Sequence, residues 1–449
     1  MMSEKRVTFA TKLGVIATAV GSAVGLGNIW RFPYETGQHG GAAFLLIYIG
    51  CILLLGIPVV LAEFIIGRGS HSNVSGAFRK LSPGTGWHYI SYLGITAAVL
   101  IMSFYSVIAG WTMEYTYQAL IDSFGSHTPE EFQQDFTAFT SSPLRPIFWT
   151  FLFLGINYVI INRGVQNGIE KYSNVMMPLL FLLLLVFCVR SITLPGAGAG
   201  LSYLFDPDFS KIDSSVVLGA MGQAFFSLSL GMGTLITYSS YFSSRTKLVR
   251  SATTIAAFDT LVAVLAGIII FPAVFTFGIS PSQGPELVFI TLPHVFQQMP
   301  GAYIWSVLFF ILLFLASLTS TISMCEISVA FFTEERKMSR KKASLLHISA
   351  CAVLGVLCSL SFGVLSEATL FGRTVFGWCD FLSSNILLPL GGMLISIYVG
   401  WVLDKKVIRK EMTNNGELRT RLARILVFVL RYIAPTAIIL IFLGGLGVF

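Results

Sequence analysis

Two glycine-rich stretches interrupt long apolar segments and lie beside side chains that carry oxygen or nitrogen. Residues 25–27 (Gly-Leu-Gly) precede Asn28, and residues 231–233 (Gly-Met-Gly) follow Ser227 and Ser229. A helix that unwinds inside a membrane leaves carbonyl groups without partners, and a bound cation can satisfy them. N-terminal ends of half-helices favour a carboxylate. These residues therefore predict a site for a hard monovalent cation and for an anionic substrate group.

Further polar residues lie deep in apolar runs. Asp259 stands in "AAFDTLVAVLAG", and residues 316–323 read "ASLTSTIS". An acid at membrane depth is costly and indicates function, whereas hydroxyl-rich runs are weaker evidence because Ser and Thr often bond to their own helix. Glu63 is expected near the interruptions. Two readings of Glu63 stay open, a protonated structural acid and a charged ligand.

The elements that position these residues are predicted to be membrane-spanning helices. Of the 449 residues, 55% are hydrophobic and 11% are charged, whereas soluble domains carry about 25% charged residues. Apolar stretches of roughly 20 residues, enough to cross a bilayer, recur along the chain. We predict an all-α integral membrane protein with eleven transmembrane helices, at about 11–36, 41–67, 90–121, 146–162, 169–193, 215–242, 252–278, 300–333, 343–363, 374–402 and 423–447.

The formal net charge of +7 has a topological explanation rather than a nucleic-acid partner. Most Lys and Arg residues collect in alternate connections between the spans, and acids such as Glu130 and Asp206 occupy the others. This asymmetry is the positive-inside rule. It predicts a multi-pass protein of the plasma (inner) membrane, with a cytoplasmic N-terminus and, after eleven spans, a C-terminus outside.

The two interruptions lie five spans apart, so the second copy must cross the membrane in the opposite direction. Paired interrupted spans indicate an inverted-repeat transporter with its site at the breaks. A single Gly-x-Gly is more often a packing surface, but two at equivalent positions favour a site. We therefore predict one transporter domain over 1–449, with repeats at 11–193 and 215–402, unwound helices 1 and 6, and an additional helix at 423–447.

Other function classes fit less well. The six cysteines fall inside predicted spans without Cys-x-x-Cys spacing, which favours packing over disulfides. Only His347 and Cys351 share a helical face one turn apart, and two ligands do not make a metal site. An enzyme is therefore not expected, and a channel would not need two broken helices. A membrane sensor that binds an amino acid without moving it remains the alternative.

Four segments closely resemble the neurotransmitter:sodium symporter family, in its bacterial amino-acid-transporting, eleven-span branch. They read "GSAVGLGNIWRFPY", "GGAAFLLIYIGCILLLGIPVVLAEFIIGR", "GQAFFSLSLGMGTLITYSSY" and "LASLTSTIS", and the resemblance runs from about Arg6 to the end. It implies sodium-coupled import by alternating access. The expected partners are an amino acid, sodium and the lipid bilayer, and no oligomeric state follows from these residues.

Carried over by position, the resemblance implies two sodium ions and a substrate pocket. The first ion would bind Ala23, Asn28, Ser227, Asp259 and the substrate carboxylate, and the second Gly21, Val24, Ala316, Thr319 and Ser320. The substrate would contact Ala23, Gly25, Gly27, Ile101, Tyr105, Phe226, Ser227, Ser229, Met232, Ser320 and Met324.

The resemblance also implies gates on both faces. An outer gate would pair Arg31 with Asp380 under a lid of Tyr105 and Phe226, and an inner latch would pair Arg6 with Glu334, supported by Tyr238 and Tyr241. The segment from Gly168 to Pro178 resembles the family element that unwinds the fifth span to open an inward sodium exit.

Two positions bear on specificity. The family's monoamine carriers have aspartate at the position of Gly25, so glycine here favours a substrate with its own carboxylate, an α-amino acid. Chloride-dependent members complete an anion site one turn after Asp259, where this chain has Ala263. A fixed carboxylate would replace chloride, which predicts chloride independence and suggests proton counter-transport through Asp259. The apolar pocket favours neutral hydrophobic or aromatic amino acids.

Overall fold

The structure is a computed structural model that describes residues 9, 12–125, 127–278, 287–417, 422–445 and 448. Within these residues all regular elements are helical, apart from one isolated antiparallel bridge between Leu370 and Arg373. The all-α prediction is confirmed.

Nine helical stretches in the described part of the chain are long and apolar enough to span a membrane. They agree with the predicted spans 2–5 and 7–11 to within a few residues. Their helices are α3 (Ala42–Cys51), α4 (Ile57–Ser70), α6 (Ile90–Leu120), α8 (Arg145–Asn162), α9 (Lys171–Ser191), α13 (Leu248–Thr276), α15 (Ala302–Glu335), α16 (Arg340–Leu360), α17 (Val375–Phe381), α18 (Leu388–Ile397), α20 (Leu422–Phe428) and α21 (Ala434–Gly445). Tight or wide helical turns continue them at Ile52–Gly56, Gly86–Tyr89, Val165–Glu170, Leu382–Leu387, Tyr398–Val402 and Val429–Ile433.

The first predicted span is broken where the sequence indicates. Helix α1 (Lys12–Ala23) ends before Gly25, and the chain resumes in a π-helical turn (Gly27–Arg31) that leads into α2 (Phe32–Gln38). The two parts are bent by 46°. The predicted unwinding of helix 1 is confirmed.

The sixth predicted span is broken more strongly. Helix α11 (Ser214–Ser227) and helix α12 (Thr234–Ser239) are separated by residues 228–233. In that segment Ser229, Gly231 and Gly233 have φ of 53°, 87° and 81°, a left-handed backbone that no helix interior has. Neither half alone is long enough to cross a bilayer, so the count of eleven spans remains a prediction while the unwinding of helix 6 is confirmed.

The second break touches the backbone of α18. A Cβ on Gly231 would lie 2.2 Å from the carbonyl oxygen of Leu388, and one on Gly391 would lie 2.1 Å from the carbonyl oxygen of Gly231. Only glycine permits this approach at both positions. The break is therefore held inside the bundle rather than exposed to lipid.

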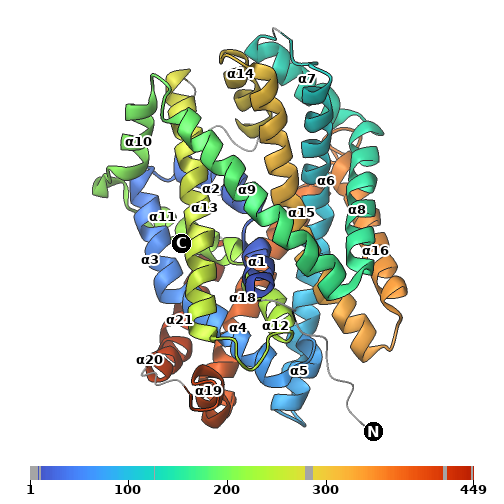
Figure 1. Ribbon diagram of the computed structural model, residues 1–449, viewed down its shortest axis with the longest axis vertical. Coiled ribbons are helices and arrows are strands. Elements are labelled where there is room, and N and C mark those ends of the chain that lie inside the picture. The colour runs from blue at the N-terminus through green and yellow to red at the C-terminus, as the bar shows by residue number, and fades with distance from the viewer. Residues whose placement is uncertain are drawn as a thin grey trace.

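Shorter helices lie between the spans. They are α5 (Val74–Leu81), α7 (Pro129–Ser141), α10 (Ala197–Phe205), α14 (Leu292–Gln297) and α19 (Lys405–Met412), with turns at Phe209–Lys211 and Leu287–Thr291. Figure 1 shows α7, α10 and α14 at one end of the bundle and α5 and α19 at the other. Most of the basic residues lie at the end with α5 and α19, and the end with α7 carries acidic residues such as Glu130 and Glu131, which is the arrangement the charge asymmetry predicts. The orientation in a membrane stays a prediction.

Candidate substrate and ion site

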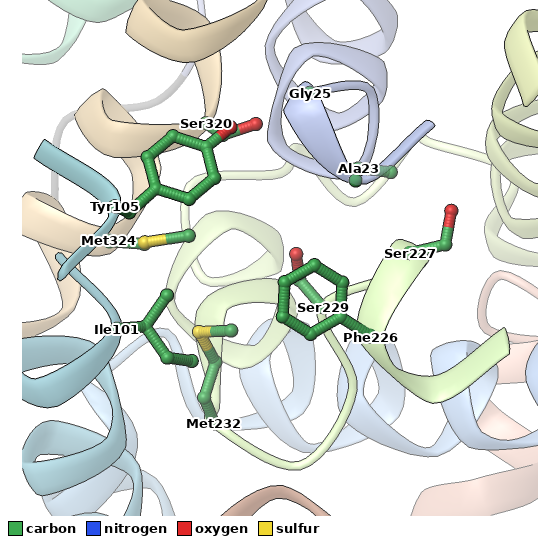
Figure 2. Close-up of a pocket in the computed structure, with 11 residues that line it drawn as sticks. Ala23, Gly25, Ile101, Tyr105, Phe226, Ser227, Ser229, Met232, Ser320 and Met324 are labelled. Carbon is green, nitrogen blue, oxygen red and sulfur yellow. The ribbon is translucent and has the colours of Figure 1, made fainter. Parts of the chain in front are cut away.

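All eleven residues predicted to contact the substrate line one cavity between the two breaks, α6 and α15. Its volume is about 20 Å³, room for about one water molecule, so the side chains are closed around it. Figure 2 shows Ile101 and Met324 on the side of Met232, with the ring of Phe226 opposite. The others are Ala23, Gly25, Gly27, Tyr105, Ser227, Ser229 and Ser320.

The first break forms one wall of this cavity. The backbone N–H of Leu26 donates to the hydroxyl of Tyr105 at 2.9 Å, which leaves the phenolic proton for another acceptor. A Cβ on Gly25 would lie 2.1 Å from Ser320 Oγ and 2.9 Å from the Tyr105 hydroxyl. The missing side chain at Gly25 thus lets α15 and α6 approach the unwound backbone.

Three of the residues predicted for the first ion form one buried hydrogen-bonded cluster. Asn28 Nδ2 donates to Ser227 Oγ at 3.0 Å and to Asp259 Oδ1 at 2.7 Å, and the Ser227 hydroxyl lies 2.8 Å from both oxygens of the Asp259 carboxyl group. Asn28 Oδ1 accepts from the backbone N–H of Gly25 at 3.0 Å. The cluster joins the first break, the end of α11 and the middle of α13.

Sequence analysis missed a fourth member of this cluster. The hydroxyl of Tyr48, on α3, donates to Asp259 Oδ2 at 3.2 Å and lies 3.4 Å from Ser227 Oγ. Tyr48 is fully buried. Its only sequence signal is a single phenol in the otherwise apolar run "FLLIYIGCILL".

The residues predicted for the second ion also come together. The hydroxyls of Thr319 and Ser320 both donate to the carbonyl oxygen of Val24, at 3.3 and 3.2 Å, and Thr319 also lies 3.0 Å from the carbonyl of Ala316. A Cβ on Gly21 would be 3.5 Å from Thr319. The candidate ion ligands are neutral oxygens, as a hard monovalent cation prefers.

A site for a transition metal is a different case. Among the described residues no group of three or more His, Cys, Asp or Glu side chains could hold a metal ion.

Glu63 supports the second break. It is buried on α4, and its two carboxyl oxygens accept from the backbone N–H groups of Gly231 at 2.9 Å and Ile236 at 3.3 Å. The carboxyl group therefore satisfies amides that the break leaves without helical partners. This geometry matches the structural reading of Glu63, whatever its protonation.

Two further side chains brace the breaks. Ser229 Oγ, in the second break, donates to the carbonyl of Ser22 at 3.2 Å, close to where α1 ends at the first break. Gln223 Nε2 donates to the carbonyl of Gly27 at 3.1 Å. The contribution of Gln223 was not predicted, although an amide in the apolar run before the second break is a signal that could have found it.

Arg31 and Asp380, the predicted outer pair, are not joined in this structure. Arg31 lies 3.4 Å from Glu35, one helical turn away, and its guanidinium stands 4.4 Å above the ring of Phe226. Asp380 Oδ1 accepts from Ser384 at 2.9 Å. The i,i+4 spacing of Arg31 and Glu35 is a local pairing signal that sequence analysis did not use.

The inner latch can be followed only in part, because Arg6 lies outside the described residues. Its predicted partner Glu334 accepts from the backbone and side-chain N–H groups of Asn73 at 2.9 and 3.0 Å. The Tyr241 hydroxyl donates to buried Glu326 at 2.7 Å, and Glu326 is paired with Arg340. This buried acid–base pair on α15 and α16 was not predicted.

The segment from Gly168 to Pro178 is helical in this structure. Gly168 lies in the π-helical turn Val165–Glu170, and Pro178 lies inside α9. The segment is therefore not unwound in this conformation. Its unwinding in an inward-opening conformation stays a prediction.

The sodium:neurotransmitter symporter family matches residues 6–135 and 144–449 of the chain. The chain belongs to this family. The symporter is 39% identical over 448 residues to the sodium-dependent transporter YhdH of Bacillus subtilis, covering 100% of this chain and 99% of that protein. It is 32% identical to the sodium-dependent transporter MJ1319 of Methanocaldococcus jannaschii, covering 92% and 86%.

The symporter also matches a solved structure of MhsT in complex with L-phenylalanine. The TM-score is 0.92 at 45% identity, over 98% of this chain and 100% of that chain. The fold is therefore that of the family, and the resemblance seen in the sequence is confirmed. The family consists of sodium-dependent transporters rather than enzymes, so sodium-coupled membrane transport is the activity of this symporter.

Proposed function

We propose that the symporter imports neutral hydrophobic or aromatic α-amino acids together with two sodium ions, by alternating access. The observation that carries this proposal is the cavity of eleven residues between the two oxygen-rich clusters. Its side-chain end is lined by Ile101, Met232 and Met324, which suit an apolar substrate, and the flexible thioethers can repack around different shapes. The likeness to MhsT, whose structure holds L-phenylalanine, supports the same class.

The backbone end of the cavity suits an amino-acid carboxylate. The Tyr105 hydroxyl already accepts from Leu26, so its proton is available to donate to a carboxylate oxygen. The carboxylate would also complete the first sodium site beside Asn28. Substrate and sodium would then raise each other's affinity by the same factor, as linkage requires.

Asp259 supports chloride independence. Its carboxyl group receives hydrogen bonds from Asn28, Ser227 and Tyr48, which stabilise a carboxylate without a chloride ion nearby. A buried carboxylate without a sodium ion beside it is expensive, so we also propose that Asp259 takes up a proton when sodium leaves. Each cycle would then move a proton outward.

The test is binding of radiolabelled amino acids to purified protein in sodium chloride, sodium gluconate and potassium chloride. Binding of L-phenylalanine or L-leucine in both sodium salts, but not in potassium, is expected. Binding that ignores sodium would contradict both ion sites, and binding only in chloride would contradict the role of Asp259. Uptake into proteoliposomes then separates transport from sensing, because a sensor would bind without accumulating substrate.

A further inference from the structure

A second cavity lies at the start of α13, away from the substrate site. Its volume is about 370 Å³, within the range of small-ligand pockets. Figure 1 shows α13 beginning at the end of the bundle that also carries α5 and α19, the end expected to face the cytoplasm. None of the residues assigned to the substrate, the ions or the gates lines this cavity.

The charge of the lining is strongly positive. Arg245, Lys247 and Arg250 line the cavity and are exposed. Among the described residues no carboxylate forms an ion pair with any of the three. Some basic residues at this end are paired, as Arg68 is with Glu411 and Arg79 with Glu335, whereas exposed ones on α19 have no ion pair among the described residues but line no part of this cavity. The cavity therefore gathers three cations without an anionic partner in the part of the chain that the structure describes.

The start of α13 adds backbone donors to these cations. This 29-residue helix begins at Leu248, and no side chain caps it, whereas Asp213 and Ser339 cap α11 and α16. Its first N–H groups and the positive end of its dipole suit an anion, phosphate above all. Ser251, in the first turn of this helix, also lines the cavity and is only 8% exposed.

The loop before α13 is held by hydrogen bonds from two residues outside it. Arg68 donates to the carbonyl of Thr246, and Asn414 Nδ2 donates to the carbonyl of Arg245 at 3.4 Å. Arg68 is itself buried and bonded to Glu411 and Asn414. Because Arg68 of α4 and Asn414, which follows α19, hold the carbonyl groups of the loop, its basic side chains line the cavity from a preorganised backbone.

The apolar residues of the lining belong to α1. Val15 and Ile16 line the cavity together with four hydroxyl-bearing residues, Ser243, Thr246, Ser251 and Thr254. A soluble anion would use the cations and the hydroxyl groups but would gain nothing from Val15 and Ile16, whereas a lipid would also place an acyl chain along α1. Basic clusters at the cytoplasmic surface attract anionic headgroups. We propose that this cavity binds one anionic phospholipid, which bridges α1 and the start of α13.

The bridge would act on transport through α1. Val15 and Ile16 belong to α1, the part of the first span before its break. An opening of the inner face beside this cavity would have to move α1 away from α13. A lipid held between α1 and α13 stabilises the conformation in which the two are adjacent. Occupancy therefore slows the opening of the inner face.

The test compares two matched triple variants. Arg245→Gln, Lys247→Gln and Arg250→Gln remove the cations of the cavity. The control, Lys405→Gln, Arg409→Gln and Lys410→Gln, removes three exposed basic residues from α19 at the same end. Native mass spectrometry with dioleoylphosphatidylglycerol should show one retained lipid in the wild type and the control. The cavity variant should bind on the order of 100-fold more weakly. Equal losses in both variants, or a loss in neither, would overturn the proposal.

Two further arms separate the alternatives. Dioleoylphosphatidylcholine should not be retained, and inorganic phosphate should not stabilise the protein against heat as the anionic lipid does; equal protection by phosphate would assign the cavity to a soluble anion instead. Ser251→Leu keeps all three charges but fills the cavity, so it should also lose the lipid. Retention by this variant would contradict a lipid inside the cavity. Sodium-dependent phenylalanine binding verifies that each variant is folded.

Discussion

Asn28 and Asp259 are joined by two hydrogen bonds from one amide group, to the carboxyl oxygen at 2.7 Å and to the main-chain oxygen at 3.1 Å. The pair ties the first break to the middle of α13, and Ser227 adds the end of α11. A change at this junction therefore acts on three spans together. Substitutions at this junction therefore test whether sodium binding depends on the charge of Asp259.

Asp259→Asn should make transport depend on chloride. The amide keeps the size and much of the hydrogen bonding but removes the negative charge, so without chloride the apparent sodium affinity should fall about tenfold, the scale of one lost charged hydrogen bond. Sodium-driven phenylalanine uptake into proteoliposomes, in chloride and in gluconate, measures this. Full uptake by the variant in gluconate would contradict the role of Asp259.

Gly25→Ala should weaken substrate binding by about tenfold or more, because the new methyl group would stand 2.1 Å from Ser320 Oγ and overpacking costs roughly 1–3 kcal/mol. The dissociation constant of phenylalanine is the measurement. Gly50→Ala is the control, since nothing lies within 4 Å of a Cβ there. Equal affinities in the two variants would disprove the close fit around Gly25.

Thr319→Val should reduce apparent sodium affinity about fivefold, the effect of one hydroxyl ligand worth roughly 1 kcal/mol. The matched control is Thr321→Val, because the Thr321 hydroxyl bonds only to carbonyls of its own helix, Ser317 and Leu318. Sodium titration of phenylalanine binding measures both. If Thr321→Val lowers affinity as much as Thr319→Val, the second ion site is misplaced.

Glu63→Ala should destabilise the protein more than Glu63→Gln. Alanine leaves the N–H groups of Gly231 and Ile236 buried without acceptors, at a cost of about 1–3 kcal/mol, whereas glutamine retains one carbonyl oxygen. Thermal unfolding in detergent gives the order, with Glu367→Gln in an exposed loop as control. An unchanged unfolding temperature for Glu63→Ala would contradict the proposal that Glu63 stabilises the second break.

The breaks and Asp259 could be predicted from local signals, whereas pocket residues such as Ile101 and Tyr105 were expected only from the family resemblance. Two Gly-x-Gly interruptions and one acid in an apolar run identify the breaks and Asp259 from neighbouring residues alone. The residues that were missed act across long separations: Tyr48 meets Asp259 from 211 residues away, and Gln223 reaches Gly27 from 196. A lone phenol or amide in an apolar run has many packing roles, so only the fold reveals its partner.

Charge pairs were harder to predict than the breaks. Glu326 and Arg340 are 14 residues apart, and their pairing depends on the turn between α15 and α16. Sequence analysis paired Arg31 with Asp380, whereas in the structure Arg31 pairs with Glu35, one helical turn away. Such choices depend on conformation, because an ion pair at a moving interface need not form in every state.

The two breaks are hydrogen-bonded to different helices, so each can respond to the movement of a different part of the bundle. Glu63 on α4 holds the second break, whereas Thr319 and Ser320 on α15 hold the first. If α15 slides relative to α4, the hydrogen bonds that hold the first break are strained, whereas those from Glu63 to the second break stay in place. The first span would then tilt with α15, while the sixth span keeps its position relative to α4.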